Sequence, residues 1–295
     1  MNQRSSTTIL TDRLSIKRED VLGNGISGNK FRKLKYNILE AQKLGFTKII
    51  TFGGGYSNHI LAASFIKTAY GIDVIGVIRG EELVNKVEEN PTLKQAQANG
   101  MQFHFVSREV YRTKNSAEFI ANLKTLYGDC YVLPEGGTNK LAIKGCEEIL
   151  TPQDAVYDYI CCAVGTGGTL AGLINASLPH QNIIGFSALK GDFLKKEVSE
   201  MVLKTNWTIQ TDYHFGGYAK VTKDLIAFMN TFKTETGILL DPIYNAKQMY
   251  GIYDLIKKGY FSKNTSILAV HTGGQQAISG MNMLLQKKGW PLINI

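Results

Sequence analysis

Short apolar runs rich in β-branched residues alternate along the chain with longer segments of helical periodicity. Runs of this kind are typical of buried strands, and the longer segments between them are typical of helices. The predicted strands are "KIITFGG" (Lys48–Gly54), "DVIGVIRG", "MQFHFVS", "CYVLPEGG", "DYICCAVGTGG", "NIIGFSAL" and "TSILAVHTGG". The predicted helices are "SNHILAASFIKTAYG", "NPTLKQAQANG", "SAEFIANLKTLYG" and "NKLAIKGCEEIL". This repeated alternation predicts an α/β fold with parallel sheets and helical crossovers.

Three of the predicted strands end in glycine-rich turns: "TFGGGYSNH", "AVGTGGTLAG" and "VHTGGQQA". Ligands bind beyond the carboxyl ends of strands in open parallel sheets, so the three turns could converge on one cleft. The 295 residues contain no obvious linker and no short repeat. The pattern therefore favours two lobes with chain crossings between them.

Composition narrows the class of protein further. The apolar content of 44% and the charged content of 20% are those of an ordinary globular chain, and no apolar run reaches the length of a membrane span. The N-terminal segment lacks an apolar signal region, which predicts a cytoplasmic protein with reduced thiols. The four cysteines and five histidines show no metal-ligand spacing, so we expect no metal. Cys161 and Cys162 lie in an apolar run and are predicted core residues.

The net charge of +8 raises the possibility of a nucleic-acid partner. The basic residues are scattered, however, and no basic stripe interleaves with aromatic residues. A general attraction for anionic small molecules fits the charge equally well. We therefore expect a small-molecule ligand and neither a nucleic acid nor a membrane partner.

The turn "AVGTGGTLAGL", residues 163–173, has the features of an anion site. Its glycines allow a sharp turn with exposed backbone N–H groups, its threonines add hydroxyl donors, and a helix begins at the same point. The predicted phosphate-binding residues are Gly165, Thr166, Gly167, Gly168 and Thr169. The alternative is a turn that only allows a helix and a strand to pack closely.

The kind of phosphate can be narrowed. The fingerprint of a nicotinamide-binding site needs a glycine where this chain has Leu170. It also needs an acidic residue at the end of the next strand, where this chain has Ser187 and Lys190. Asp192 lies too far along the chain to take that place. No ATP P-loop motif is present. A monophosphate ligand is favoured over a dinucleotide.

A lysine at the start of a helix supplies the second candidate group. Lys30 lies in "SGNKFRKLKY", where a turn signal meets a helical pattern. It could be one of several solvated lysines, as we expect of Lys33 and Lys35. It could also be a reactive amine, with a pKa lowered by Arg32, Lys33 and desolvation. A reactive lysine together with a monophosphate cradle suggests pyridoxal phosphate.

Five segments together resemble one family of pyridoxal-phosphate enzymes. The segments are "SGNKFRKLKY", "GGGYSNH", "AVGTGGTLAGL", "DPIYNAKQ" and "HTGG". In this order they resemble the 1-aminocyclopropane-1-carboxylate deaminases and D-cysteine desulfhydrases, over about Leu14 to Gly274. The resemblance implies a fold-type-II enzyme, related to the tryptophan synthase β subunit, with the cofactor in a cleft between two domains. It implies a larger domain of residues 1–44 and 144–295, a smaller inserted domain of residues 45–143, and a homodimer.

The resemblance also assigns roles. Lys30 matches the lysine that forms the Schiff base with the cofactor, and Asn58 the asparagine that contacts the ring oxygen. Ser57 matches a serine implicated in proton transfer, and the alternative is that Ser57 and Asn58 are helix caps only. Tyr56 departs from the usual glutamine, which leaves substrate preference open.

Two tyrosines complete the set of expected site residues. Tyr244 resembles a tyrosine that stacks near the cofactor ring, and Tyr218 a second active-site tyrosine in a looser motif. Both could also be ordinary core aromatics. His271, before the last glycine turn, is expected to be structural.

The expected activity is deamination of a small amino acid. At the position of Asn245, ring-opening deaminases of the family usually have a glutamate that can sit against the pyridine nitrogen. A neutral Asn245, with Thr272 as the hydroxyl partner of that nitrogen, should leave the ring less electron-withdrawing. This favours thiol elimination from D-cysteine over opening of the cyclopropane ring, unless Asn245 points away from the cofactor. Three further functions stay open: β-replacement, non-catalytic cofactor binding or amino-acid sensing, and nicotinamide-dependent oxidoreduction.

Overall fold

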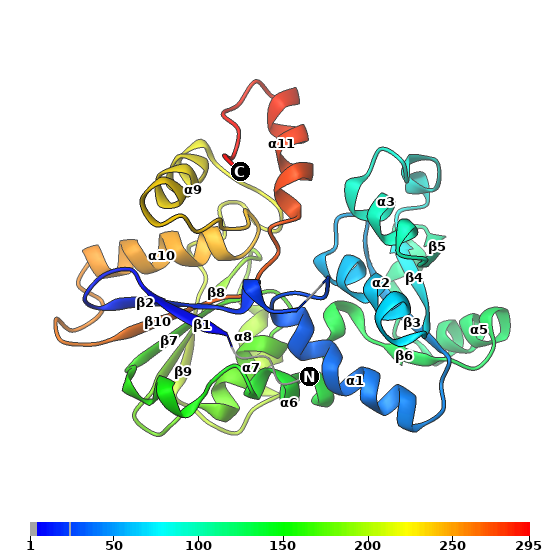
Figure 1. Cartoon of the computed structure of the whole chain (residues 1–295), viewed down its shortest axis with the longest axis horizontal. Coiled ribbons are helices and arrows are strands. Elements are labelled where there is room, and N and C mark those ends of the chain that lie inside the picture. The colour runs from blue at the N-terminus through cyan, green and yellow to red at the C-terminus, as the bar shows by residue number, and fades with distance from the viewer. Residues whose placement is uncertain (1–4, 24) are drawn as a thin grey trace.

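Two sheets form the frame of the molecule (Figure 1). The computed structural model describes residues 5–23 and 25–295. The larger sheet has the strand order β1-β2-β10-β7-β8-β9 and the smaller one β5-β4-β3-β6. β1 and β2 pair antiparallel, and the other pairings of the described strands are parallel. The strands are β1 (Ser6–Ile9), β2 (Leu14–Arg18), β3 (Lys48–Gly54), β4 (Asp73–Arg79), β5 (Gln102–Val106), β6 (Tyr131–Leu133), β7 (Tyr159–Val164), β8 (Asn182–Ser187), β9 (Trp207–Gln210) and β10 (Ile267–His271).

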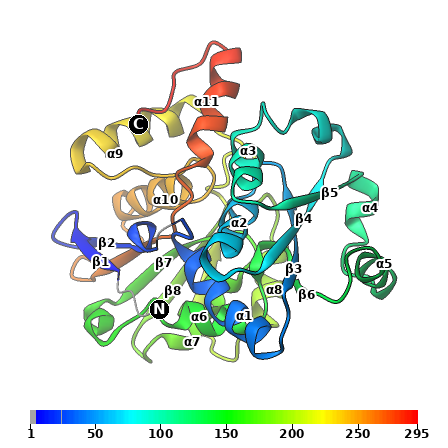
Figure 2. The same cartoon turned by 45° about the vertical axis from the view of Figure 1, so that its right-hand side comes forward.

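Helices cover both faces of the larger sheet (Figure 2). Alternate residues of β7 face opposite sides: Cys161 packs with α9, α10 and α11, whereas Ile160 and Cys162 pack with α6, α7 and α8. The two cysteines are fully buried free thiols, which confirms their predicted place in the core. These helices are α6 (Lys140–Glu147), α7 (Gly168–Ala176), α8 (Phe193–Ser199), α9 (Lys223–Thr236), α10 (Asn245–Lys257) and α11 (Ala277–Lys287).

The smaller sheet has its own core on each face. Ile49 of β3 packs with residues of α1, α2 and α3, and Phe52 packs on the other face with residues of α4 and α5. The helices are α1 (Asn29–Lys43), α2 (Asn58–Tyr70), α3 (Pro91–Ala98), α4 (Arg108–Arg112) and α5 (Ala117–Tyr127). Short 3-10 helices are η1 (Glu19–Val21), η2 (Glu81–Lys86), η3 (Glu135–Gly137) and η4 (Pro152–Val156).

Helix α1 joins the two units. Its apolar residues Leu34 and Ile38 belong to the core of the smaller sheet, while the helix also packs along α6 beside the larger one. The four-stranded sheet uses residues 48–133, and the six-stranded sheet uses residues 6–18 and 159–271. The exact predicted domain limits stay a prediction. Helix α1 precedes residue 45, where the smaller domain was predicted to begin, and it nevertheless contributes to the core of the smaller sheet.

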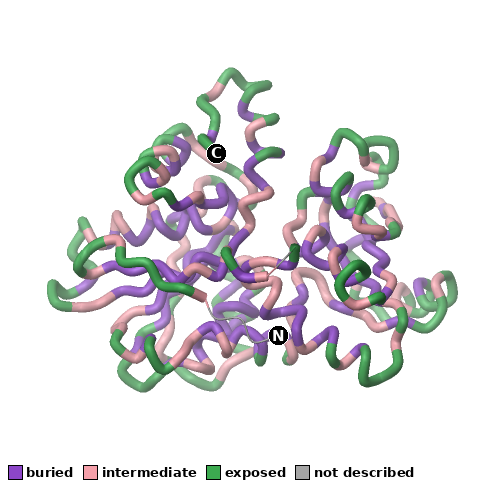
Figure 3. The backbone as a smooth tube through the Cα atoms, viewed as in Figure 1, coloured by how far each residue is buried: buried purple, intermediate pink, exposed green. Residues whose placement is uncertain are grey.

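The elements predicted from hydrophobic patterning are present. All seven predicted strands and all four predicted helices occur in the structure, and β3 has the predicted bounds. Buried segments follow the strands and the inner faces of the helices (Figure 3). Among the described residues, no helix is long and apolar enough to cross a membrane.

Candidate active site

The three glycine turns meet at one cavity between the sheets. It has a volume of about 1010 Å³ and is bordered by the turns that follow β3, β7 and β10. Strand direction explains this arrangement, because carboxyl ends of parallel strands lie at the same edge of a sheet. The predicted site residues on its wall are Lys30, Ser57, Asn58, Gly165, Thr166, Gly167, Thr169, Tyr218, Tyr244 and Thr272. Gly168 and Asn245 are not among the described residues that line it.

Lys30 reaches the cavity from the first turn of α1. Gly28, the N-cap, has a φ of 65°, and a Cβ there would come within 2.2 Å of the carbonyl oxygen of Thr272. Glycine therefore lets α1 begin directly against the turn after β10. Asn29 secures this start: its backbone N–H donates to the carbonyl oxygen of Thr272 at 3.1 Å, and its amide Nδ2 to Thr169 Oγ1 at 2.8 Å. Lys30 is thus held between two of the three turns.

The environment of Lys30 favours a neutral amine. Burial lowers the pKa of Lys30 to about 7, and the nearby charge of Lys33 contributes to the same shift. The predicted contribution of Arg32 is wrong, because its guanidinium turns away and forms a buried ion pair with Glu19 at 2.9 Å. A substantial fraction of neutral amine near pH 7 is what a nucleophilic lysine needs.

Lys33 is a site residue that the sequence patterns did not reveal. It was expected to be solvated, but only 2% of the residue is exposed. Its Nζ donates to Thr138 Oγ1 at 2.9 Å and to Thr166 Oγ1 at 3.3 Å. Among the described residues, no carboxylate lies within ion-pairing distance of this ammonium, so an anion bound at the turn would be its partner. The i, i+3 spacing from Lys30 puts both lysines on one helix face, which is the signal that could have found it.

Lys35 was also expected to be solvated, and this too is wrong. It is 8% exposed and pairs with Glu148 at 2.7 Å. Its partner lies on the α6 side, away from the cavity lining. Lys35 therefore helps to fix α1 against α6, whereas Lys33 serves the cavity.

The turn between β7 and α7 has the geometry of an anion cradle. Gly167 caps α7 with a φ of 76°, a left-handed conformation that a β-branched residue adopts only with strain. The free N–H groups of the first turn of α7 begin at this point. The Lys33 ammonium lies beside Thr166. The cradle therefore combines the positive end of the α7 dipole with a positive side-chain charge, and both favour binding of a phosphate.

Ser57 and Asn58 lie where α2 begins. Ser57 is the N-cap, since its Oγ accepts hydrogen bonds from the backbone N–H of His59 at 3.2 Å and of Ile60 at 3.3 Å. Ser57 is therefore a cap and Asn58 is not, and whether Ser57 is only a cap stays open, because these bonds leave the hydroxyl proton free and the side chain borders the cavity. Asn58 accepts at Oδ1 from Gln276 Nε2 at 2.8 Å, which leaves its Nδ2 as a donor. The role of Ser57 in proton transfer stays a prediction.

Tyr56 packs across the cleft. A Cβ at Gly280 of α11 would come within 3.0 Å of the Tyr56 ring. The tyrosine lies on the small unit and α11 on the large one, so the two units are in contact at the edge of the cavity. Substrate preference stays open at this position, as the departure from glutamine suggested.

Tyr218 and Tyr244 lie side by side on the cavity wall. Their ring centroids are 6.2 Å apart with the rings inclined at 64°. Tyr244 also lies against Gly165, where a Cβ would approach its ring to 3.0 Å. Burial raises the pKa of both phenols, so both are neutral hydroxyl groups near pH 7.

Several further polar residues border the cavity without having been predicted, among them His59 and Tyr111. Buried His59 lies with Nε2 2.7 Å from Thr51 Oγ1, and burial together with Lys30 and Lys33 holds its pKa well below the usual range. Tyr111 donates to Glu135 at 2.8 Å. His59 ends the segment "GGGYSNH" but was given no role there, whereas Tyr111 belongs to no quoted motif, so only the folded arrangement places Tyr111 at the site.

The set of groups fits pyridoxal phosphate. A largely neutral Lys30 amine can bind its aldehyde, the cradle with Lys33 can hold its phosphate, and Asn58 offers a donor to its ring oxygen. The arrangement defines a class of protein: an enzyme that holds a phosphorylated aldehyde through a lysine. In the described residues, no group of three or more His, Cys, Asp or Glu side chains could hold a metal ion.

Comparison with known proteins agrees with this class. The family model "Pyridoxal-phosphate dependent enzyme" matches residues 3–273, and the chain belongs to that family. It is 30% identical over 290 residues to an Arabidopsis thaliana protein named "Bifunctional D-cysteine desulfhydrase/1-aminocyclopropane-1-carboxylate deaminase, mitochondrial", covering 88% of this chain and 72% of the relative. A Klebsiella pneumoniae "D-cysteine desulfhydrase" is 28% identical over 295 residues, covering 89% and 87%.

The fold agrees as well. The crystal structure of an "ACC deaminase homologue" superposes with a TM-score of 0.79 at 29% identity, covering 93% of this chain and 88% of that one. The expected α/β fold, family and cofactor are therefore confirmed, and a nicotinamide-dependent or non-catalytic function loses its support. The homodimer and the cytoplasmic location stay predictions.

Proposed function

We propose that the protein eliminates the thiol group of D-cysteine or of a related β-substituted amino acid. One molecule of D-cysteine and one of water would give pyruvate, ammonia and hydrogen sulfide. The names of the relatives include both activities: a Klebsiella pneumoniae relative is named "D-cysteine desulfhydrase", and a Pyrococcus horikoshii relative, 33% identical, is named "Putative 1-aminocyclopropane-1-carboxylate deaminase", which supports 1-aminocyclopropane-1-carboxylate as the alternative substrate.

The residues around the cavity have distinct chemical roles. When bound, pyridoxal phosphate withdraws electrons from the α-carbon of the amino acid joined to it. Lys30 binds the cofactor between turnovers and, once released by the substrate, takes the α-proton at Nζ. Its pKa of about 7 suits a base that must also give the proton back. Ser57, with a free hydroxyl proton at the cavity wall, is the second proton-transfer group.

The tyrosines and the phosphate site have positioning roles. Tyr244 covers the cavity beside Gly165, and Tyr218 completes that wall. Lys33 and the turn of residues 165–169 anchor the phosphate, and Asn58 donates to the ring oxygen. Fixed contacts at both ends of the cofactor hold its reactive carbon beside Lys30.

Asn245 does not line the cavity, so the preference for elimination no longer rests on Asn245 and rests on Thr272 at the end of β10. The cavity wall there presents the neutral hydroxyl of Thr272, and Asp241, a carboxylate 0% exposed, lies behind Asn245. Without a carboxylate in direct contact, the ring withdraws electrons less strongly. Elimination of a thiol from an activated β-carbon needs a weaker electron sink than cleavage of a carbon–carbon bond.

A product assay tests the proposal. The purified holoenzyme is incubated with D-cysteine, and pyruvate, ammonia and sulfide are measured. We expect the three products in equal amounts, and none from the Lys30→Ala variant. A panel of small amino acids in both enantiomers then defines the preferred substrate, and holoenzyme that releases no keto acid from any of them contradicts the proposal.

A further inference from the structure

Lys247, in the first turn of α10, is a buried cation that the proposed chemistry does not use. It is 1% exposed, and among the described residues no carboxylate lies within ion-pairing distance of its ammonium. Its Nζ donates instead to the backbone carbonyl oxygens of His214 and Gly217, each at 2.8 Å. The dipole of α10 disfavours a cation in its first turn, so these two bonds must offset that cost and the loss of water.

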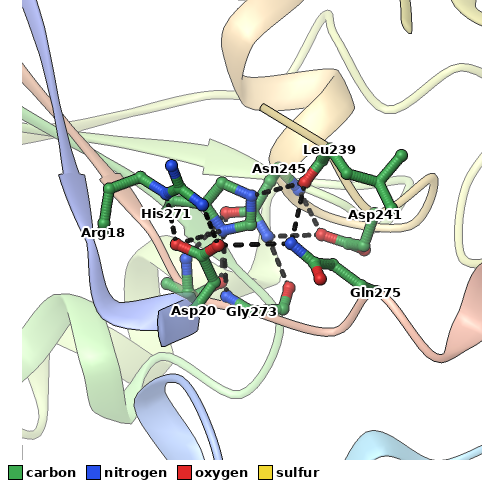
Figure 4. A network of polar contacts seen from close by, with 9 residues as sticks. Arg18, Asp20, Leu239, Asp241, Asn245, His271, Gly273 and Gln275 are labelled. Carbon is green, nitrogen blue, oxygen red and sulfur yellow. Dashed lines mark hydrogen bonds and ion pairs between the residues drawn. The ribbon is translucent and has the colours of Figure 1, made fainter. Parts of the chain in front are cut away.

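The side chain of Lys247 is charged at neutral pH. Burial lowers its pKa to about 8, and the negative charge of Asp241 opposes this shift. Asp241 is held at the start of α10 by Asn245, whose backbone N–H and amide both donate to its carboxylate (Figure 4). The two carbonyl oxygens therefore accept charge-assisted hydrogen bonds, which are stronger than bonds from a neutral donor.

The two carbonyl oxygens belong to consecutive tight turns. The N–H of Gly217 donates to the carbonyl oxygen of His214 at 3.0 Å, and the N–H of Lys220 to that of Gly217 at 3.1 Å. Each turn contains a non-glycine residue in the left-handed region, Phe215 with a φ of 52° and Ala219 with a φ of 55°, and no other described non-glycine residue has a positive φ. Such a conformation is strained and persists only where surrounding contacts maintain it.

The turns pack along one face of α10. Tyr213, just before them, donates to Asp254 at 2.7 Å, and the ring of Phe215 contacts that of Tyr250 with the centroids 5.0 Å apart. Positions 247, 250 and 254 are spaced by three and four residues, so Lys247 lies on the same helix face as these partners. Tyr213 and Phe215 fix the beginning of the segment, whereas Lys247 also binds the second turn.

Tyr218 follows Gly217 directly and borders the cavity together with Ala219. The centroid of its ring lies 6.2 Å from that of Tyr244. We propose that Lys247 is a positioning residue for this part of the cavity wall: its ammonium holds residues 214–219 in the conformation that puts Tyr218 beside Tyr244. The inference rests on the proposed function, in which Tyr218 completes the wall of the amino-acid site.

The position of Lys247 separates binding of the amino acid from binding of the cofactor. Lys247 is not among the described residues that line the cavity, so it can act there only through the turns. The residues expected to hold pyridoxal phosphate lie on other elements: Lys30, Lys33, Asn58 and the turn of residues 165–169. Loosening of residues 214–219 should therefore weaken binding of the amino acid and leave binding of the cofactor nearly unchanged.

Hydrogen–deuterium exchange of the holoenzyme tests whether Lys247 holds the turns. In the natural protein, the amides of Gly217 and Lys220 should exchange far more slowly than in an unstructured peptide, because contacts from α10 maintain the turns. Lys247→Met, with a neutral side chain of similar length, should accelerate their exchange by roughly 10- to 100-fold, the value of hydrogen bonds to a charged group. Lys257→Met, at the exposed end of α10, is the matched control and should leave their exchange unchanged.

Two results of the exchange experiment would overturn the proposal. One is exchange of these amides in the natural protein as fast as in an unstructured peptide, and the other is equal exchange in the natural protein and Lys247→Met. Circular dichroism checks that each variant is folded. If Lys247→Met does not fold, the exchange of the natural protein decides the outcome.

A double-mutant cycle tests whether Lys247 acts through Tyr218. Lys247→Met should raise KM for the amino acid about 10-fold or more and change the dissociation constant of pyridoxal phosphate by less than about 3-fold. Tyr218→Ala should have a comparable effect, and Lys247→Met added to Tyr218→Ala should cost little more. Additive effects, or equal losses of amino-acid and cofactor binding, would contradict a positioning role.

The cycle uses D-cysteine or whichever amino acid the product assay identifies. If no amino acid is turned over, the proposed function fails, and the exchange experiment still decides whether Lys247 holds the turns.

Discussion

Asn29 donates a hydrogen bond to the hydroxyl of Thr169 at 2.8 Å, and so connects the residue before Lys30 to the glycine turn 140 positions further along the chain. The two halves of the proposed cofactor site, the Lys30 amine and the phosphate cradle, are thereby fixed relative to each other. A mutation in either segment should then affect both the attachment of the cofactor to Lys30 and the binding of its phosphate.

The reactivity of Lys30 should follow its lowered pKa. Above pH 7 the amine is mostly neutral and nucleophilic, and below pH 7 it is protonated, so the rate of labelling of the cofactor-free protein by an amine-directed reagent should rise with a midpoint of about 7. Peptide mapping identifies the labelled lysine, and Lys30→Arg is the control. A midpoint near the ordinary lysine value of about 10.4 contradicts the assignment.

Borohydride reduction of the yellow holoenzyme gives a direct test of attachment. The reduced cofactor should be found on Lys30, because this amine lies in the cavity beside the phosphate cradle. A label on Lys33 or on any other lysine would show that the assignment is wrong.

Lys33 should bind the phosphate and not the rest of the cofactor. Lys33→Met removes a buried ammonium from Thr166 and should weaken binding of pyridoxal phosphate by roughly 10- to 100-fold, the value of a hydrogen bond to a charged group. Binding of pyridoxal, which lacks the phosphate, should change little. Equal losses for the two ligands would indicate a general disturbance of the cavity.

Gly167→Val should remove most of the bound cofactor. The substitution forces a β-branched residue to a φ of 76° and brings its Cβ to 2.9 Å from Val198. Gly237→Val is the matched control, since Gly237 has a φ of 69° at the end of α9 with no atom within 4 Å of an added Cβ. The control should lose stability but keep its cofactor. Normal occupancy in Gly167→Val would place the cradle elsewhere.

Ser57→Ala should separate capping from catalysis. Loss of the cap costs about 0.5–2 kcal/mol of stability, and loss of a proton-transfer group costs roughly 10²–10⁴ in turnover. Ser116→Ala removes an equivalent cap of α5, where Ser116 Oγ accepts from Phe119 at 3.2 Å, far along the small unit. It should lose similar stability and keep its rate. If Ser57→Ala does the same, Ser57 is only a cap.

Local patterns predicted much of the fold and the site. Strand periodicity and the glycine turns located β3, β7 and β10 and the cleft they share, because backbone conformation at glycine is a local property. The same reasoning singled out Lys30 and the glycine turn after β7, which both border the cavity. Lys33 was misjudged because charge alone does not reveal whether a helix face is buried by distant segments.

The orientation of Asn245 could not be read from its motif. The sequence suggested a direct contact with the cofactor, whereas in the structure the amide lies behind Thr272 and is bound by Asp241 and Gly273. The Asp241 carboxylate and the Gly273 carbonyl oxygen both accept hydrogen bonds from the Asn245 amide. Their position around the amide depends on how the turn after β10 packs against α10. Only the tertiary structure brings these two segments together.

The comparison of kcat/KM for D-cysteine and for 1-aminocyclopropane-1-carboxylate, measured on the same holoenzyme preparation, tests the central claim most directly. The account predicts efficient release of sulfide and pyruvate from D-cysteine and slow or absent formation of 2-oxobutanoate, because the wall at Thr272 supplies no carboxylate to the ring nitrogen. Ring opening at a rate that matches or exceeds sulfide release would contradict it.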